Sequence, residues 1–149
     1  MVGVAKILTG EMAAGEKRIT DTADTCRQLG IANVVATCGF VLGDVYTRIA
    51  AGDEKPPLRV ILKNLGYMLR TVPVAHAKAV RHLTAALEYY RTISAPSFIA
   101  STLFNLGLLD KKKKRMDAAN AKFDEARELA ASVDFQPLVE MIDEAKRVD

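Results

Sequence analysis

The sequence has no tryptophan, only two cysteines and few aromatic residues, and each shortage excludes a class of protein. Cys26 and Cys38 lack CxxC or metal-ligand spacing, so they do not form a disulfide framework or a zinc site. Two reduced thiols packed as small apolar side chains are the simpler interpretation, which favours a cytoplasmic protein. The stacking aromatics and basic stripes of a nucleic-acid-binding protein are not evident either, so no nucleic-acid partner is expected.

Long hydrophobic runs are also missing. No segment reaches the roughly eighteen uninterrupted apolar residues of a membrane span, so none is predicted. The opening residues 1–8 (MVGVAKIL) are too short for a signal peptide and lack a fitting cleavage site. The net charge of +3 is small, and acidic residues are interspersed with basic ones, which gives little support for binding an anionic membrane.

Catalytic signatures are absent as well. There is no Gly-x-Ser-x-Gly, no Walker loop and no recognisable Cys/His pair. His76 and His82 are six residues apart and fall on different faces of a helix, whereas a helical metal site needs histidines four apart. We therefore expect no metal or cofactor and no catalytic residue, and we expect that the chain is not an enzyme.

What the sequence does contain is helical periodicity, punctuated by clusters of glycine and proline. It predicts a single all-α domain over 1–149. The expected helices are a partial one before Gly10, then 12–29, 31–51, 57–72, 74–94, 96–111, 116–133 and 136–147.

An internal repeat organises these helices. The pairs Leu42-Gly43 and Leu106-Gly107 have matching residues at equal distances before them, such as Phe40 and Phe104, three residues before each glycine. Later matches give a unit of forty residues, which fits one pair of helices. The two glycines are 64 residues apart, so 24 extra residues separate the two helices of the first pair; the insertion spans about 56–79.

The spacing within each pair is typical of a tetratricopeptide repeat. Such a repeat needs a small residue where paired helices touch, a large apolar residue as a knob, and small residues where adjacent pairs pack. Gly43 and Gly107 provide the small residues, at a cost of about 1 kcal/mol each in helix propensity. Leu83 and Phe123 provide the large ones. The chain is therefore expected to form a right-handed α-solenoid of tetratricopeptide-like hairpins with an inserted helix.

The segment YTRIAAGDEKPPLRVILKNLGYML (46–69), with NLGLLDKKKKRMDAANAKFDEARELA further on, resembles the C-terminal helical-repeat region of bacterial class III adenylate/guanylate cyclases. The most distinctive match is Gly-x-x-Lys-Pro-Pro-Leu at 52–58. The resemblance implies a fragment of a larger signalling protein, with catalysis in a cyclase domain whose metal-binding and purine-reading residues match nothing here.

The first helix of each pair should line a concave, partner-binding groove. The groove residues expected from the family register are Thr37, Phe40, Asp44, Thr47, Arg48, Ser101, Phe104, Leu108 and Lys111. Aspartate at 44 would repel a carboxylate, so a groove that clamps chain termini is not favoured.

The insertion carries an apolar face formed by Leu58, Leu62, Leu65 and Leu69, together with Ile61. This face could cover the core, associate with a second copy or lie on a membrane; core or dimer contact is favoured because helices flank it. The basic run Lys111 to Arg115 could bind phosphate or direct localisation, but a solvated turn that complements a helix dipole is favoured.

Three functions remain open. The first is a non-catalytic regulatory domain of a cyclase-like protein, acting in signal transduction through a protein partner or a homodimer. The second is a free-standing adaptor. The third is an enzyme or small-molecule sensor with a pocket beside the insertion.

Overall fold

In a computed structural model of the chain, residues 3, 7, 9–52 and 58–147 are described, and every element among them is helical. The all-α prediction is therefore confirmed for this part of the chain. The beginning of the insertion at 56 lies outside these residues, as does most of the 52–58 motif. The helix expected before Gly10 is described only at Gly3 and Ile7, both of which are helical.

The helix boundaries agree closely with the expected ones except in the insertion. The elements are α2 (Met12–Gln28), α3 (Ala32–Ala51), α4 (Leu58–Lys63), α5 (Leu65–Thr71), the 3₁₀ helix η1 (Val72–Val74), α6 (Ala75–Thr92), α7 (Pro96–Lys112), α8 (Met116–Ser132) and α9 (Gln136–Arg147).

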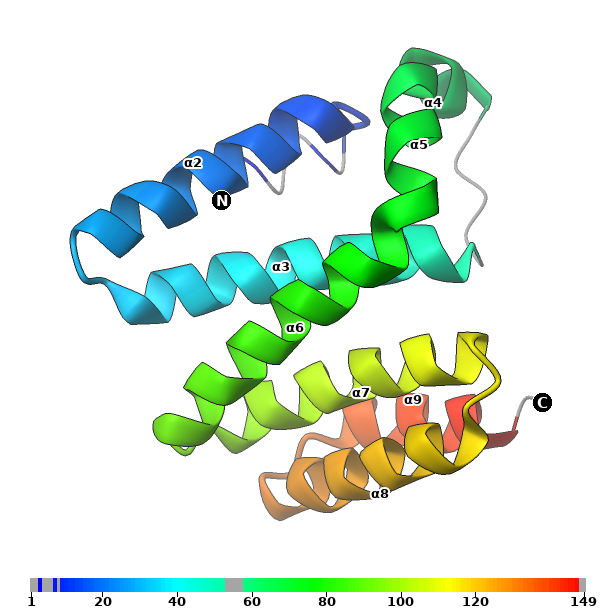
Figure 1. Cartoon of the computed structure of the whole chain (residues 1–149). Coiled ribbons are helices and arrows are strands. Elements are labelled where there is room, and N and C mark those ends of the chain that lie inside the picture. Colours follow the sequence, from blue (N-terminus) through cyan, green and yellow to red (C-terminus); the bar gives the residue numbers. More distant parts are fainter. Residues whose placement is uncertain (1–2, 4–6, 8, 53–57, 148–149) are drawn as a thin grey trace.

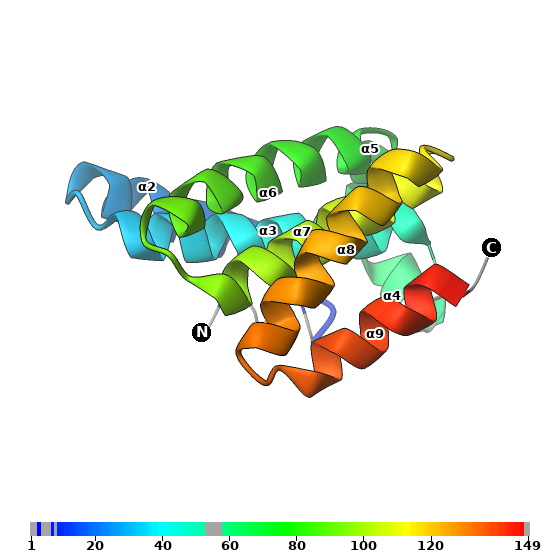
Figure 2. The same ribbon diagram turned by 90° about the horizontal axis from the view of Figure 1, so that it is seen from below.

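The helices pack as pairs in a stack (Figure 1). The helix α3 packs against α6 although the insertion separates them in the sequence, and α7 packs against α8. The helix α2 covers α3 at one end, and α9 contacts α8 and α7 at the other. Figure 2 shows α6 on one side of α3 and α7, with α9 on the opposite side. The insertion, α4 and α5, projects from the end of α3 (Figure 1).

Two glycines bring paired helices together at matching places. A Cβ atom at Gly43 would lie 2.5 Å from Cγ of Leu83, and one at Gly107 would lie 2.5 Å from Cε1 of Phe123. Leu83 and Phe123 are completely buried. Since carbon atoms cannot approach so closely, each large side chain requires the glycine opposite it.

A third contact of this kind occurs at the beginning of the chain. A Cβ atom at Gly3 would lie 2.6 Å from Cγ1 of Ile19. Gly3 precedes Gly43 by forty residues, and it precedes Ile19 by the same sixteen residues that separate Gly107 from Phe123. The three contacts therefore share one sequence register.

The turns between helices share a register too. A residue with positive φ occurs at Gly10 and Gly30, and again at Ser94, Lys114 and Asp134, at intervals of twenty residues within each set. At every one of these turns except Gly10, the residue that follows donates its backbone N–H to the carbonyl of the residue five positions before it, at 2.8 to 3.0 Å. This bond is the mark of a Schellman motif, which ends a helix by satisfying its last carbonyls.

The insertion forms two short helices, so the single helix expected over 57–72 is wrong. The helix α4 ends at Lys63 and α5 begins at Leu65, because Asn64 between them adopts φ −113° and ψ 15°. This ψ lies far from the helical value of about −42°. Beyond α5 the chain continues through η1 directly into α6 (Figure 1).

Candidate functional site

Asn64 ties the insertion to the turn before α2. Its Nδ2 atom donates to the carbonyls of Gly10 at 2.7 Å and Val60 at 2.8 Å, and its Oδ1 atom accepts from the N–H of Met12 at 3.3 Å. Val60 also packs over Gly10, with its methyl carbons 3.4 Å from the place of a Cβ. Asn64 is buried. One face of the insertion is therefore held against the body of the molecule.

The leucines of the insertion lie on its other face. Leu58, Leu62, Leu65 and Leu69 are 70%, 63%, 47% and 68% exposed. It is unusual for four large apolar side chains so close in sequence to be this exposed on a surface without a partner, because exposed side chains forgo the free energy that burial would provide. Of the three uses considered for this face, covering the core does not occur in the folded chain.

A polar cluster joins the inner side of the insertion to α2, α3 and α6. Glu16 accepts hydrogen bonds from the hydroxyl of Tyr46 and from Nζ of Lys78, the latter at 3.1 Å. Tyr67 of α5 also donates to Glu16. Lys78 donates to the Tyr46 hydroxyl at 3.1 Å and lies 4.8 Å from the centre of its ring. The His82 ring stacks on the Tyr46 ring, with the two ring centres 5.7 Å apart. Four helices therefore meet at one carboxylate.

The environment of this cluster fixes its protonation. Burial raises the pKa of Glu16, but the hydrogen bonds from Tyr46, Tyr67 and Lys78 outweigh it, so the pKa lies below its ordinary value of 4.5. Burial and the nearby carboxylate raise the pKa of both tyrosines well above their usual range. Burial, together with two nearby cations, lowers the pKa of His82. The tyrosines remain donors, and the cluster holds the helices together.

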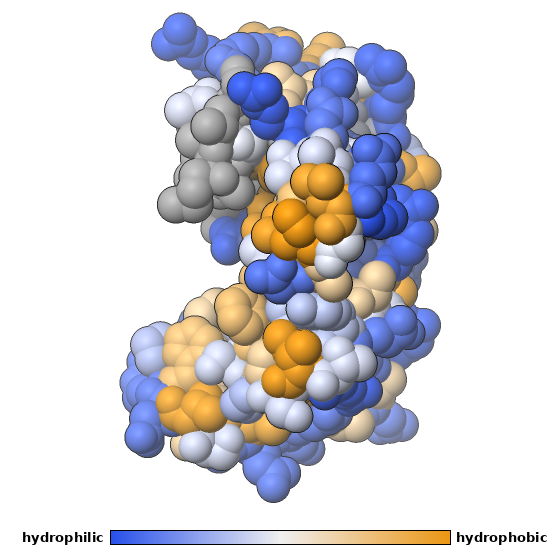
Figure 3. Space-filling model, turned by 90° about the vertical axis from the view of Figure 1, so that its left-hand side faces the viewer, coloured by the Kyte–Doolittle hydropathy of each residue, from blue (hydrophilic) through white to orange (hydrophobic). Residues whose placement is uncertain are grey.

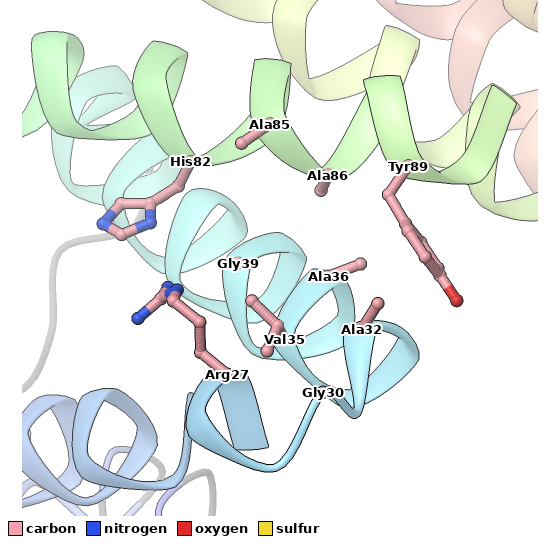
Figure 4. Close-up of a pocket in the computed structure, with 10 residues that line it drawn as sticks. All are labelled: Arg27, Gly30, Ala32, Val35, Ala36, Gly39, His82, Ala85, Ala86 and Tyr89. Carbon is pink, nitrogen blue, oxygen red and sulfur yellow. The ribbon is translucent and has the colours of Figure 1, made fainter. Parts of the chain in front are cut away.

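An open groove of about 290 Å³ lies between the end of α2 and α6, and α3 forms its floor (Figure 4). Arg27 of α2 reaches toward His82 of α6 across it, and the floor consists of small residues (Figure 4). The lining residues are Arg27, Gly30, Ala32, Val35, Ala36, Gly39, His82, Ala85, Ala86 and Tyr89. Arg27, His82 and Tyr89 are the polar side chains among them, and the others are glycine or apolar, so most of the groove offers apolar contact area.

A second cavity, of about 480 Å³, lies between α2 and the insertion helix α5. Glu16 of the polar cluster forms part of its wall, and Lys17 is paired with Asp21 at 2.7 Å on the same wall. The lining residues are Ala13, Glu16, Lys17, Thr20, Asp21, Tyr67, Arg70 and Thr71. The mixture of charges would suit a small polar molecule better than an apolar one.

The groove residues expected on α3 differ in their exposure. Thr37 and Arg48 are exposed, and Phe40 and Asp44 are half-buried. Thr47 is only 2% exposed, and its hydroxyl donates to the carbonyl of Gly43, one turn earlier in α3, at 2.8 Å. Thr47 therefore contributes no surface to a partner.

Those expected on α7 are largely covered by neighbouring helices. Phe104 is 8% exposed and its ring centre lies 6.0 Å from that of Phe123. Lys111 is half-buried and donates to the carbonyl of Ala145 in α9 at 2.6 Å. Ser101 and Leu108 are half-buried. The nine expected residues therefore do not form one continuous exposed groove.

The basic run at the end of α7 is engaged in local contacts. Arg115 pairs with the buried carboxylate of Asp110 at 2.5 Å, and Lys122 pairs with the same carboxylate at 2.6 Å. Lys112 donates to the carbonyl of Ala51 at the end of α3. These contacts agree with a solvated turn that holds helix ends together.

A further edge of the molecule exposes apolar residues at the turns between pairs. Leu29 is 68% exposed, Ile93 is 51% exposed and Phe98 is 47% exposed. Figure 3, which faces this edge, shows the apolar residues in separate patches with polar residues between them. The exposed residues of this edge provide matched controls for the leucines of the insertion.

Reasoning from sequence missed three residues that position the insertion and the pairs. Gly3 carried a signal, since it precedes Gly43 by the repeat length. Asn64 carried a weaker one, as a lone amide on the apolar inner side of the insertion. Glu16 carried none, because its partners lie 30 and 62 residues away in the sequence.

The described residues contain no group of three histidine, cysteine or acidic side chains placed to hold a metal ion. Among them one helix, α3, has the length and composition of a membrane span. This is weak evidence for a membrane, because an apolar helix packed between others meets the same criteria, and α3 contacts α2, α6 and α7.

Comparison with protein-family models, with curated proteins and with solved structures finds no match to this chain.

Proposed function

We propose that this chain is a non-catalytic protein-interaction module made of tetratricopeptide-like hairpins. The three glycine contacts in one register, at Gly3, Gly43 and Gly107, support the hairpin interpretation. The positive-φ turns at twenty-residue intervals support it too, since evenly spaced turns are what a repeated unit produces. The helix α9 then serves as the terminal helix that covers the last hairpin.

The exposed leucine face of the insertion carries the functional proposal. A solvent-exposed cluster of this kind is retained in a soluble fold mainly where another surface covers it. The surface, called here the leucine face, consists of Leu58, Leu62, Leu65 and Leu69. Its covering partner is either another protein or a second copy of the chain, as in a homodimer.

The test replaces Leu62 or Leu65 with glutamate and measures oligomeric state by sedimentation and partner capture by affinity purification. The matched control is Leu29→Glu, at a leucine of similar exposure on a different edge. The proposal expects the insertion variants to lose an association that the control keeps. It is refuted if the insertion variants fold normally and change neither measurement.

We further propose a regulatory role beside a cyclase-like catalytic domain, acting in signal transduction in the cytoplasm. The residues at 46–69 that resemble the cyclase tail support this, and the two free cysteines agree with a reducing compartment. A free-standing adaptor is the alternative. Sequencing the gene upstream of Met1 separates the two: an in-frame cyclase domain supports the first, and an upstream stop codon supports the adaptor.

The cavity between α2 and α5 favours a second candidate, a small-molecule sensor. Its size is in the lower part of the range of ligand sites, and it combines cations with carboxylates. A thermal-shift screen with nucleotides and other small polar metabolites tests it. A ligand that raises the melting temperature in the wild type but not in a Glu16→Gln variant supports a sensor; no shift with any compound counts against it.

A further inference from the structure

The side chains of the insertion are arranged in three stripes around each helix. With about 3.6 residues per turn, Leu58 and Leu62 point to one side of α4, and Arg59 and Lys63 lie next to them on one flank only. Val60 lies on the far side, where it packs over Gly10.

The same order recurs in α5. Leu65 and Leu69 lie on one side, Arg70 follows on the same flank, and Tyr67 and Thr71 are turned toward the body of the molecule. Both helices therefore expose a leucine stripe with cations along one edge of it.

The charged residues of this flank are all basic. From Leu58 to Leu87 the sequence contains five lysines and arginines and no aspartate or glutamate. Of these, Lys78 is occupied by Glu16. Arg59, Lys63 and Arg70 form no ion pair with any carboxylate of the described residues; Arg70 donates only to the carbonyl of Gly66 in its own helix, at 3.1 Å. Three cations therefore remain available beside the leucine face.

We propose that the leucine face docks an acidic amphipathic helix of a partner protein. Such a helix presents apolar side chains at spacings of three and four residues, which suit the pairs of leucines four residues apart in α4 and in α5, and carboxylates that complement the basic flank. The proposal rests on the proposed function, because it names the partner of the same surface.

The charge pattern disfavours the two other occupants. A second copy would bring its own three cations and no carboxylate from this segment, so its leucine face would offer nothing to complement the basic flank. A helix lying on an anionic bilayer has cations along both edges of its apolar face, where they reach the headgroups. Here Ile61 and Met68 occupy the second edge.

The test is a titration of the whole chain with a designed probe. The probe is a 21-residue peptide with leucine at heptad positions a and d, glutamate at e and g, and one tryptophan. Because the chain itself has no tryptophan, the fluorescence reports the peptide alone. A second peptide with lysine in place of glutamate is the charge control. The proposal expects the acidic peptide to bind at least about tenfold more tightly than the basic one, from three surface ion pairs.

Three variants define the site. Leu62→Glu with Leu69→Glu is expected to abolish binding of the acidic peptide, and Leu29→Glu to leave it unchanged. Reversing the flank with Arg59→Glu, Lys63→Glu and Arg70→Glu is expected to reverse the peptide preference. Circular dichroism of each variant establishes that it folds, so that a loss of binding is assigned to the surface.

The outcomes separate this inference from the proposed function. Equal binding of the acidic and the basic peptide overturns the proposal of an acidic partner, but it still supports the leucine face as an interaction surface. If the chain dimerises and Leu62→Glu abolishes the dimer, the occupant of the face is a second copy. If the chain binds phosphatidylglycerol vesicles but not the acidic peptide, the occupant is a membrane. No binding of either peptide, no vesicle binding and no association overturns both proposals.

Discussion

Gly39 and Gly43 lie one turn apart on α3, yet their surroundings differ. A Cβ atom at Gly39 would lie 3.5 Å from the carbonyl of His82 and 3.9 Å from Cβ of Ala86, in ordinary contact. At Gly43 it would overlap with Leu83. The same substitution therefore has opposite consequences at two positions of one helix.

We expect Gly43→Ala to lower the free energy of unfolding by about 1–3 kcal/mol through overpacking. Gly39→Ala should leave it unchanged or raise it by up to about 1 kcal/mol through helix propensity. Urea unfolding followed by circular dichroism measures both. Equal effects of the two substitutions would contradict the close contact between α3 and α6.

Lys114 adopts φ 57° at the turn before α8, a conformation that costs residues other than glycine about 1 kcal/mol. Lys114→Gly is therefore expected to raise the free energy of unfolding by roughly 1 kcal/mol. The control is Lys113→Gly, since Lys113 has φ −89° and gains nothing from glycine. Thermal unfolding of both variants tests this, and the two should move in opposite directions.

Glu16 links stability to pH. Its pKa is lower in the folded chain than in the unfolded chain, so the unfolded state binds more protons in acid. The stabilisation is present above the ordinary pKa of 4.5 and is lost as the pH falls through the folded pKa. Glu16→Gln is expected to cost about 1–2 kcal/mol at neutral pH and to flatten the fall in stability between about pH 5 and 3. An unchanged slope in urea unfolding at several pH values would show that the carboxylate is not held by its three donors.

At the scale of the elements, one amide holds the junction of α4 and α5 against the turn before α2. Asn64 makes hydrogen bonds to the backbone of Gly10, Met12 and Val60. Asn64→Ala removes them and leaves buried backbone groups unpaired, at a cost of roughly 1–3 kcal/mol.

The expected result is faster hydrogen–deuterium exchange in α4 and α5, with exchange in α7 and α8 unchanged. Asn33→Ala, at an exposed asparagine of α3, is the control. Faster exchange spread evenly over all helices would mean that the insertion is part of the cooperative core rather than an attached element.

The helices and their pairing could be predicted from sequence because the signals are local. Apolar spacing gave the helices, and residues such as Gly10, Gly30 and Pro96 gave their ends. The pairing of α3 with α6 across the insertion followed from the forty-residue unit, which makes Leu83 the counterpart of Phe123 and leaves 24 extra residues between Gly43 and Leu83. These features depend on backbone sterics and on side-chain size, both of which are readable from the chain.

The break at Asn64 and the exposure of the leucines could not be predicted. A helix pattern continues through Asn64, and only its bonds to a turn more than fifty residues earlier explain the break. Likewise, an apolar stripe does not reveal whether the domain or a partner covers it. Thr47 and Phe104 were placed in the groove by register alone, and their burial by neighbouring helices depends on the tertiary arrangement.

At the scale of the whole molecule, charge is unevenly distributed along the stack. Residues 58–115 contain eleven lysines and arginines but only two acidic residues, whereas residues 116–147 contain four lysines and arginines and eight acidic residues. The leucine face therefore belongs to the basic part of the sequence, whose charge would attract an acidic partner. This agrees with a module whose partner is chosen by charge and held by apolar contact.

The central claim is that the leucines of the insertion form a surface for a partner and not a part of the core. Urea unfolding of the Leu62→Glu, Leu69→Glu double variant, next to Leu103→Ala in the buried face of α7, tests it most directly. We predict a change below about 0.5 kcal/mol for the double variant and a loss of about 2–5 kcal/mol for Leu103→Ala. If the double variant lost as much free energy of unfolding as Leu103→Ala, the claim would be contradicted, because the isolated chain itself would then bury these leucines.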